Sequence, residues 1–324
     1  ISYTASASVV CHVGATLVLV DCAEDTFEMD YDAMAEAITE RTKAIMPVDL
    51  GGVPCDYDKI LSIVEEKKNL FSPSNDLQEA IGRVAICADT AHAFGAKYKG
   101  RMVGSVADFS SFSFHAVKNL TTAEGGCVTW NLPERVDDEA IYHQFQLLSL
   151  HGQSKDALAK TKKGAWEYDI IGPWYKCNMT DIQAALGLVQ LKRYPEMLAR
   201  RKELIERYNA IVCAAGVEPM PHYTAEHQSS GHLYITRTPG ITIERRNRII
   251  ELMGEKGVAT NVHYKPLPLL TAYKDMGFDI ADYPNAYAHY ANEITLPLHT
   301  LLTDEEADAV AHAFVETIGE ATCA

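Results

Sequence analysis

Apolar runs of strand length alternate with capped helical patterns through the first two-thirds of the chain. Residues 15–21 (ATLVLVD) form a short apolar run that ends in an acid, which is typical of a buried parallel strand. Residues 30–41 follow, with Asp30 placed to cap a helix whose apolar residues recur at helical spacing. This alternation predicts an α/β fold with a mostly parallel sheet covered by helices on both faces.

The remaining elements extend the same pattern. Further strands are predicted at 43–50, 84–90, 108–114, 126–130, 232–238 and 258–264, and further helices at 56–70, 179–212, 243–257 and 303–321. We expect Pro195 to kink or break the long helix, and residues 71–83 to form a surface insertion. The pattern and the length predict a large domain over 1–195 and a smaller C-terminal α/β domain over 196–324.

Composition excludes several classes of protein. The formal net charge of −15 argues against a nucleic-acid partner, because phosphate binding needs a basic face. No apolar run is long enough to span a membrane, and no secretory signal is visible. The eight cysteines include no C-x-x-C pair and sit mostly among apolar neighbours. They read as small buried residues in a reducing compartment, so we expect a cytoplasmic protein without a metal site.

The strongest chemical signal joins two regions of the chain. Asp89 ends the apolar run VAICAD, and Lys118 follows in SFHAVKN, with Ser113 five residues before it. Residues at the carboxyl ends of parallel strands meet at one edge of a sheet. Pyridoxal 5'-phosphate needs a lysine for its Schiff base, a carboxylate for its pyridine nitrogen and donors for its phosphate. The set therefore indicates a pyridoxal phosphate site.

Several segments closely resemble the DegT/DnrJ/EryC1/StrS sugar aminotransferases. They are ADTAHAFGAKYKGRMVGSVADFSSFSFHAVKNLTTAEGG, KCNMTDIQAALGLVQLKR, GATLVLVD, NVHYKPLPLL and ITLPLHTLLTDEEADAV, and together they cover nearly the whole chain. The resemblance implies a fold-type I aminotransferase with a seven-stranded-type sheet in its large domain. It also implies a homodimer whose active sites lie at the subunit interface.

The resemblance implies a role for each motif residue. Lys118 would form the Schiff base and move the substrate proton, and Asp89 would bind the pyridine nitrogen. His92 would contact the ring hydroxyl, and Ser113 the phosphate. Asn178 would reach the phosphate of the neighbouring subunit's cofactor.

Three further residues complete the expected site. Tyr3 matches the aromatic position that stacks on the cofactor ring. His263 and Tyr264 fall where the family's small domain closes over the bound sugar, although both could instead be core residues. The family also carries a preceding segment with a Gly-Thr pair at a helix N-terminus, which cradles the phosphate. We therefore expect the chain as written to lack one phosphate anchor.

The expected reaction is amino transfer, with glutamate as donor, to a keto group of a nucleotide-linked sugar. Relatives that aminate cyclitols or act in aminobenzoate assembly share these motifs, as does a non-catalytic relative that binds a metabolite. Relatives that dehydrate or deoxygenate sugars carry histidine in place of the Schiff-base lysine, and Lys118 argues against that branch. The absence of G-x-G-x-x-G argues against a nucleotide-binding oxidoreductase. Synthesis of surface polysaccharide, lipopolysaccharide or antibiotic sugars is compatible with the sequence.

Overall fold

The central sheet is mixed and mostly parallel, as the alternating pattern predicts. The computed structural model describes residues 1–154 and 167–323. Its main sheet has the order β1-β2-β5-β6, made of β1 (Ala44–Ile45), β2 (Ala85–Asp89), β5 (Phe109–Ser113) and β6 (Gly126–Trp130). The first three strands are parallel, and β6 pairs antiparallel to β5. Within the described ranges this sheet has four strands, fewer than the seven expected.

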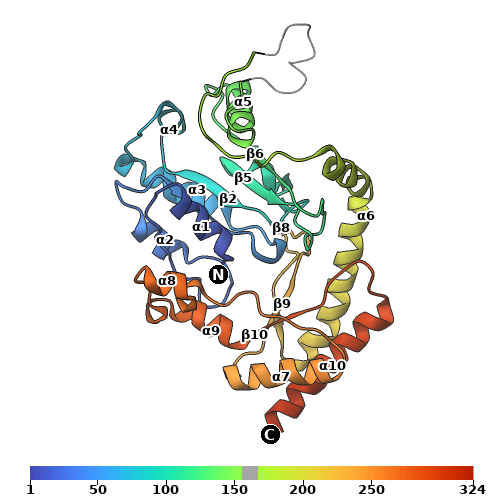
Figure 1. The fold of residues 1–324 in the computed structure, drawn as a ribbon. Coiled ribbons are helices and arrows are strands. Elements are labelled where there is room, and N and C mark those ends of the chain that lie inside the picture. The colour runs from blue at the N-terminus through green and yellow to red at the C-terminus, as the bar shows by residue number, and fades with distance from the viewer. Residues whose placement is uncertain (155–166, 324) are drawn as a thin grey trace.

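Helices surround this sheet at the positions that the capping residues indicate (Figure 1). Asp30 and Asp56 accept hydrogen bonds from the first turns of α2 (Tyr31–Ala37) and α3 (Tyr57–Glu66). Side chains of α3, such as Ile60 and Val64, pack with Ile86 of β2 in one buried cluster. The other helices of this part are α1 (Thr4–His12), α4 (Asp76–Ile81) and α5 (Asp138–Ser149). Helix α4 lies in the predicted insertion at 71–83 and buries none of its residues.

Two predicted strands do not form. Residues 15–21 form no strand and lie in none of the sheets of the described chain. Their apolar side chains split between environments, because Leu17 packs near Ala7 while Val18 is 64% exposed. In 258–264 only Asn261 pairs, with Thr295. The apolar pattern at both places reflects packing against neighbouring segments and not membership of a sheet.

The long helix α6 (Asp181–Val212) begins as predicted, with a reciprocal capping box between Thr180 and Gln183. Of the kink or break predicted at Pro195, the break is wrong, since the helix continues through this residue. Contacts on both sides hold the helix there: Tyr194 donates to the Phe94 carbonyl, and Arg201 donates to that of Gly231. These contacts compensate for the hydrogen bond that a proline removes.

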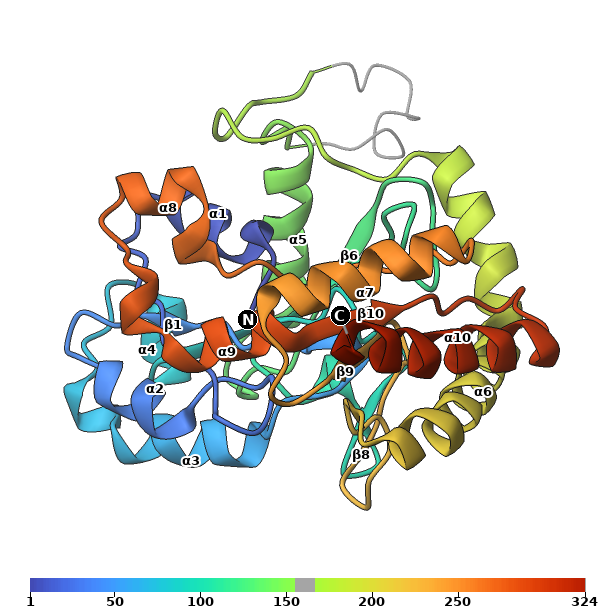
Figure 2. The ribbon, with the colours of Figure 1, turned by 90° about the horizontal axis from the view of Figure 1, so that it is seen from below.

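The C-terminal part has its own core, seen at the bottom of Figure 1 and from below in Figure 2. Strands β9 (Tyr234–Arg237) and β10 (Glu293–Leu296) pair antiparallel, and β7 (Glu218–Pro219) pairs with β9. Helices α7 (Ile243–Glu255) and α10 (Asp304–Cys323) run side by side, and their buried residues pack with the end of α6. The predicted helices are confirmed here, whereas β10 was not predicted. The domain boundary at residue 195 stays a prediction.

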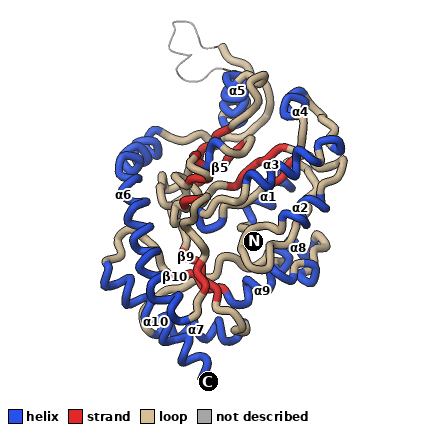
Figure 3. Tube along the Cα trace, turned by 180° about the vertical axis from the view of Figure 1, so that it is seen from behind, coloured by secondary structure: helices blue, strands red, loops and turns tan. Residues whose placement is uncertain are grey.

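The remaining elements join the two parts. Helix α8 (Thr271–Asp275) lies beside α1 (Figure 2), and helix α9 (Pro284–Asn292) contacts α7. A small sheet has the order β4-β3-β8, made of β3 (Lys97–Tyr98), β4 (Arg101–Met102) and β8 (His227–Gln228). Figure 3 shows the strands of the main sheet and of the β9–β10 sheet as separate groups. No helix in the described part is both long and apolar enough to cross a membrane.

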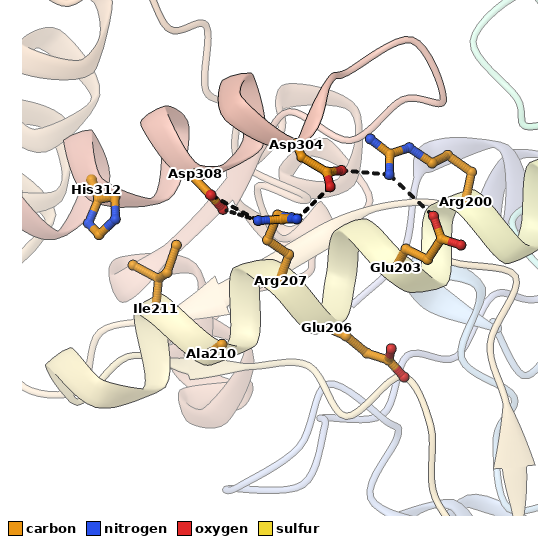
Figure 4. Close-up of a pocket in the computed structure, with 9 residues that line it drawn as sticks. All are labelled: Arg200, Glu203, Glu206, Arg207, Ala210, Ile211, Asp304, Asp308 and His312. Atoms are coloured by element: carbon orange, nitrogen blue, oxygen red, sulfur yellow. Dashed lines mark hydrogen bonds and ion pairs between the residues drawn. The ribbon is translucent and has the colours of Figure 1, made fainter.

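Ion pairs connect the outer faces of α6 and α10 (Figure 4). Arg207 bonds both oxygens of Asp308, at 2.8 and 3.0 Å, and also reaches Asp304. Arg200 donates to the other oxygen of Asp304 at 2.8 Å. These groups are partly exposed, so each pair adds little to stability. Two arginines and four carboxylates line this hollow, and both arginines are paired with acids.

Candidate active site

Asp89 is the last residue of β2, at the carboxyl edge of the parallel strands. Its backbone is fixed on one side, where Asp49 N donates to its carbonyl at 3.0 Å and its own N donates to Pro47 O at 2.8 Å. Each carboxylate oxygen takes one donor: Oδ1 accepts from Ala91 N at 3.1 Å, and Oδ2 accepts from the Ser6 hydroxyl at 2.5 Å. The acid is therefore held in one orientation at the edge where α/β sheets bind ligands.

Lys118 lies on the loop that follows β5, at the same edge of the sheet. Its backbone N donates to His115 O at 2.9 Å, and Thr122 N closes the loop onto Phe114 O at 2.9 Å. Burial lowers the pKa of the Lys118 ammonium, and the nearby Asp89 carboxylate opposes this shift. A lowered pKa leaves more of the amine neutral, which is the form that attacks a carbonyl carbon.

His92 is buried and presents a hydrogen-bond donor. Gly51 N donates to its Nδ1 at 3.2 Å, so the ring proton lies on Nε2. Burial lowers the pKa of His92 well below its usual value, and the Lys118 charge lowers it further, so the imidazole is neutral. Its Nε2 lies 3.4 Å from the hydroxyl of Tyr264. The neutral ring can therefore donate to a ligand oxygen placed beside Lys118.

The turn that supports His92 predicts a stability effect. Gly52 has φ of +91°, and a Cβ there would lie 2.1 Å from Ser230 Oγ and 3.0 Å from His92 O. We expect Gly52→Ala to lower the free energy of unfolding by about 3 kcal/mol, through strain and displacement of Ser230. Gly100→Ala is the matched control, because Gly100 has φ of +80° with open space around its Cβ position. Urea unfolding of both variants measures the difference, and equal losses would contradict the prediction.

His263 and Tyr264 come from the C-terminal part and reach the same site. His263 Nδ1 lies 2.9 Å from Thr295 Oγ1, which itself donates to Glu293 Oε1 at 2.5 Å. The Thr295 hydroxyl must therefore accept from the histidine, which leaves the lone pair of His263 on Nε2. Burial, and then the Lys118 charge, lower the pKa of His263 to about 4. Glu293 is buried, and desolvation raises its pKa to about 7.

The other predicted residues lie at different distances from this cluster. Tyr3 precedes α1 and is 58% exposed, with its ring 5.6 Å from that of Tyr264. Ser113 ends β5, and its hydroxyl accepts from His115 N at 3.2 Å. Asn178 is exposed, and its side-chain hydrogen bonds go to Lys176 and to the carbonyl of Met179. The structure therefore gathers Asp89, Lys118, His92, Tyr264, His263 and Tyr3, with Asn178 at the surface.

Sequence reasoning missed several residues that support this cluster. The ring of His232 lies against that of His92, tilted by 45° with centroids 4.3 Å apart, and its Nδ1 lies 2.9 Å from Asn119 Oδ1. The Asn119 amide donates to Ser230 O, which fixes this pairing. Asn119 is adjacent to Lys118, and Ser6 lies one helical turn after Tyr3. Their closeness in sequence to predicted site residues could therefore have identified both. Nothing in the sequence near Glu293 indicated the site.

The arrangement fits pyridoxal phosphate. A carboxylate fixed by two donors suits a protonated pyridine nitrogen, and a lysine of lowered pKa suits the cofactor's aldehyde carbon. The donor at His92 Nε2 suits the ring hydroxyl. In the described residues no cluster of histidine, cysteine or acidic side chains could hold a metal ion. The donor set therefore suits an organic cofactor that carries an aldehyde and a basic ring nitrogen.

Comparison with known proteins supports this assignment. The model of the DegT/DnrJ/EryC1/StrS aminotransferase family matches residues 1–315. The spore coat polysaccharide biosynthesis protein SpsC of Bacillus subtilis is 37% identical over 321 residues, covering 97% of this chain and 76% of its own length.

Solved structures agree. A proposed sugar aminotransferase, Spr1654 of Streptococcus pneumoniae, superposes in its PMP-form with a TM-score of 0.97 and 56% identity, over 99% of this chain and 80% of that one. Its PLP-form gives a TM-score of 0.95 and 55% identity, over 99% of this chain and 79% of that one. PseC of Helicobacter pylori is an aminotransferase involved in pseudoaminic acid biosynthesis. It gives a TM-score of 0.84 and 29% identity, over 99% of this chain and 78% of that one. The chain belongs to the DegT/DnrJ/EryC1/StrS aminotransferase family and is a pyridoxal phosphate-dependent enzyme of fold type I.

Proposed function

We propose that this enzyme transfers an amino group from glutamate to a keto group of a nucleotide-linked sugar. The observation that carries the proposal is the pairing of Lys118 with Asp89 at one sheet edge, with the donor nitrogen of His92 beside them. Two relatives support a sugar substrate: Spr1654 is a proposed sugar aminotransferase, and SpsC takes part in spore coat polysaccharide biosynthesis. The similarity to SpsC also supports a role in surface polysaccharide synthesis.

Each residue of the site has a separate role in the proposed reaction. Pyridoxal phosphate, when bound, supplies an electron sink that weakens the bonds at the carbon bearing the amino group. The Lys118 amine would hold the cofactor. Once substrate displaces it, this amine would take the proton from the carbon that bears the amino group and later return it. Asp89 keeps the ring nitrogen protonated, His92 donates to the ring hydroxyl, and Ser113 donates to the phosphate. Tyr3 stacks on the ring.

We assign His263 and Tyr264 to the substrate. Because Thr295 Oγ1 accepts a hydrogen bond from Nδ1, the lone pair of His263 lies on Nε2, where Asn261 Nδ2 is 3.5 Å away. A sugar hydroxyl would donate to this lone pair in place of the long contact with Asn261. Tyr264 lies between His92 and Tyr3, with ring centroids 6.3 and 5.6 Å away, and its hydroxyl suits a polar group of the substrate. Both residues come from the C-terminal part, whereas Lys118 and Asp89 belong to the main sheet, so the substrate would bridge the two parts.

We further propose a cytoplasmic homodimer in which Asn178 serves the partner's cofactor. Exposed apolar residues on the first turns of α6, among them Ile182, Leu188 and Val189, support a protein contact on this face. Asn178 lies just before this helix and is itself exposed. Its side chain would become part of an active site only when a second copy covers the surface. The free cysteines of the described residues support a reducing compartment.

Transfer of labelled nitrogen tests the reaction. With the enzyme loaded with pyridoxal phosphate and supplied with ¹⁵N-glutamate, we expect release of 2-oxoglutarate and then ¹⁵N in an amino sugar when a nucleoside diphosphate keto sugar is added. Mass spectrometry of the products measures both steps. Label that enters a keto cyclitol but not the keto sugar would contradict the sugar assignment. Absence of 2-oxoglutarate, with alanine or aspartate active instead, would contradict glutamate as the donor.

A further inference from the structure

Helix α1 brings a hydroxyl group into direct contact with the acid of the site. Ser6 Oγ lies 2.5 Å from Asp89 Oδ2, across 83 residues of sequence. We propose that Ser6 is a positioning residue that holds the Asp89 carboxylate in the orientation needed for the cofactor's ring nitrogen. The inference rests on the pyridoxal phosphate site described above, and it assigns a role to a residue outside the recognised motifs.

The direction of this hydrogen bond is fixed by chemistry. A carboxylate only accepts, so the Ser6 hydroxyl must donate to Asp89. The Ser2 hydroxyl lies 2.8 Å from Ser6 Oγ and 3.0 Å from the Tyr3 carbonyl, so its one proton is shared between these two acceptors. Hydrogen bonds to charged groups are short and strong. With Ala91 N on Oδ1 and Ser6 on Oδ2, both oxygens are held, so the plane of the carboxylate cannot rotate freely.

Other contacts anchor α1, so the role of Ser6 is separable from folding. Thr4 Oγ1 lies 2.6 Å from the Tyr273 hydroxyl of α8, and Ala7 is buried in a cluster with Leu267 and Tyr273. Tyr3 lies one helical turn before Ser6. The start of α1 therefore places an aromatic ring and a hydroxyl donor at one site, while Thr4 and Ala7 hold the helix. Loss of the Ser6 hydroxyl alone should leave the helix in place.

The expected consequence is weaker and altered cofactor binding. Without the Ser6 donor, Asp89 keeps one fixed oxygen and gains freedom to turn away from the ring nitrogen. A hydrogen bond to a charged group contributes enough that its loss changes an equilibrium by about tenfold or more. We expect Ser6→Ala to weaken pyridoxal phosphate binding about tenfold and to shift the pH at which the visible absorption band of the bound cofactor titrates.

Three variants separate positioning from structure. Ser6→Ala removes the donor, and Ser6→Thr keeps a hydroxyl and should restore binding to within about threefold of the unaltered protein. Ser8→Ala is the matched control, because Ser8 lies on the same helix and its hydroxyl is 3.2 Å from Thr4 Oγ1, not near Asp89. The readouts are the dissociation constant for pyridoxal phosphate, the pH titration of the visible band, and the melting temperature of the cofactor-free protein.

The outcomes distinguish the proposals. Weaker binding and a shifted titration in Ser6→Ala, with Ser8→Ala and Ser6→Thr close to the unaltered protein, would support positioning. Equal affinity and titration in Ser6→Ala and Ser8→Ala would overturn it, as would a melting temperature that falls while both cofactor readouts stay constant. If the unaltered chain takes up pyridoxal phosphate but transfers no nitrogen to a keto sugar, the substrate assignment fails and the Ser6 comparison still stands.

Discussion

Lys118→Arg should abolish covalent attachment of the cofactor and lower the rate of amino transfer by about 10³-fold or more. Arginine keeps the positive charge and most of the volume, but its guanidinium stays protonated and cannot attack an aldehyde. The loop should survive the change, because the bonds from Lys118 N to His115 O and from Thr122 N to Phe114 O do not involve the Lys118 side chain. Borohydride reduction followed by peptide mass spectrometry reports the attachment, and release of 2-oxoglutarate reports the rate.

A control on the surface completes this test. Lys192→Arg changes an exposed lysine of α6 and should leave labelling and rate unchanged. The unaltered protein should carry one reduced label, at Lys118. A label on another lysine would contradict the assignment, and so would a Lys118→Arg protein that is still labelled and active. An unchanged melting temperature in the cofactor-free Lys118→Arg protein would show that the loss is chemical.

Short-range sequence patterns predicted the positions of Asp89 and Lys118 well. Asp89 ends an apolar strand and Lys118 follows the next strand, so parallel pairing of β2 with β5 was enough to bring them together. The cap at Asp30 gave the start of one helix, and the starts predicted at residues 56 and 179 lie within two residues of those observed. Each of these predictions depends on residues close in sequence, where propensity and periodicity are informative.

Contacts across long stretches of chain were not predictable in this way. Residues 15–21 have the composition of a buried strand, but whether an extended segment joins a sheet depends on a partner that its own sequence does not specify. The support of His263 by Glu293 requires β10 to lie against 258–264, and the contact of Ser6 with Asp89 spans 83 residues. A buried glutamate and a helical serine have no periodic signature, so only the fold identifies their partners.

Asp89→Asn should be the second large effect, lowering the rate of amino transfer by about 100-fold or more, equivalent to about 3 kcal/mol of barrier. The amide has the shape of the acid but carries no charge to keep a ring nitrogen protonated. Its oxygen can still accept from Ala91 N, and its NH₂ group then faces Ser6 Oγ, which can accept because a hydroxyl both donates and accepts. Rotation of the Ser6 hydroxyl therefore accommodates the amide, so we expect a change of about 1 kcal/mol or less in unfolding free energy.

Combining Asp89→Asn with Ser6→Ala gives the sharper measurement. If Ser6 acts through the carboxylate, its removal weakens cofactor binding in the unaltered protein but has little further effect once the carboxylate is gone. Urea unfolding reports stability in the same cycle, where removal of the Ser6 hydroxyl leaves the amide NH₂ group without its acceptor. Dissociation constants and urea unfolding of the four proteins in this cycle measure both quantities. Strictly additive effects would mean that Ser6 and Asp89 act independently, and the contact at 2.5 Å would then have no part in holding the acid toward the cofactor.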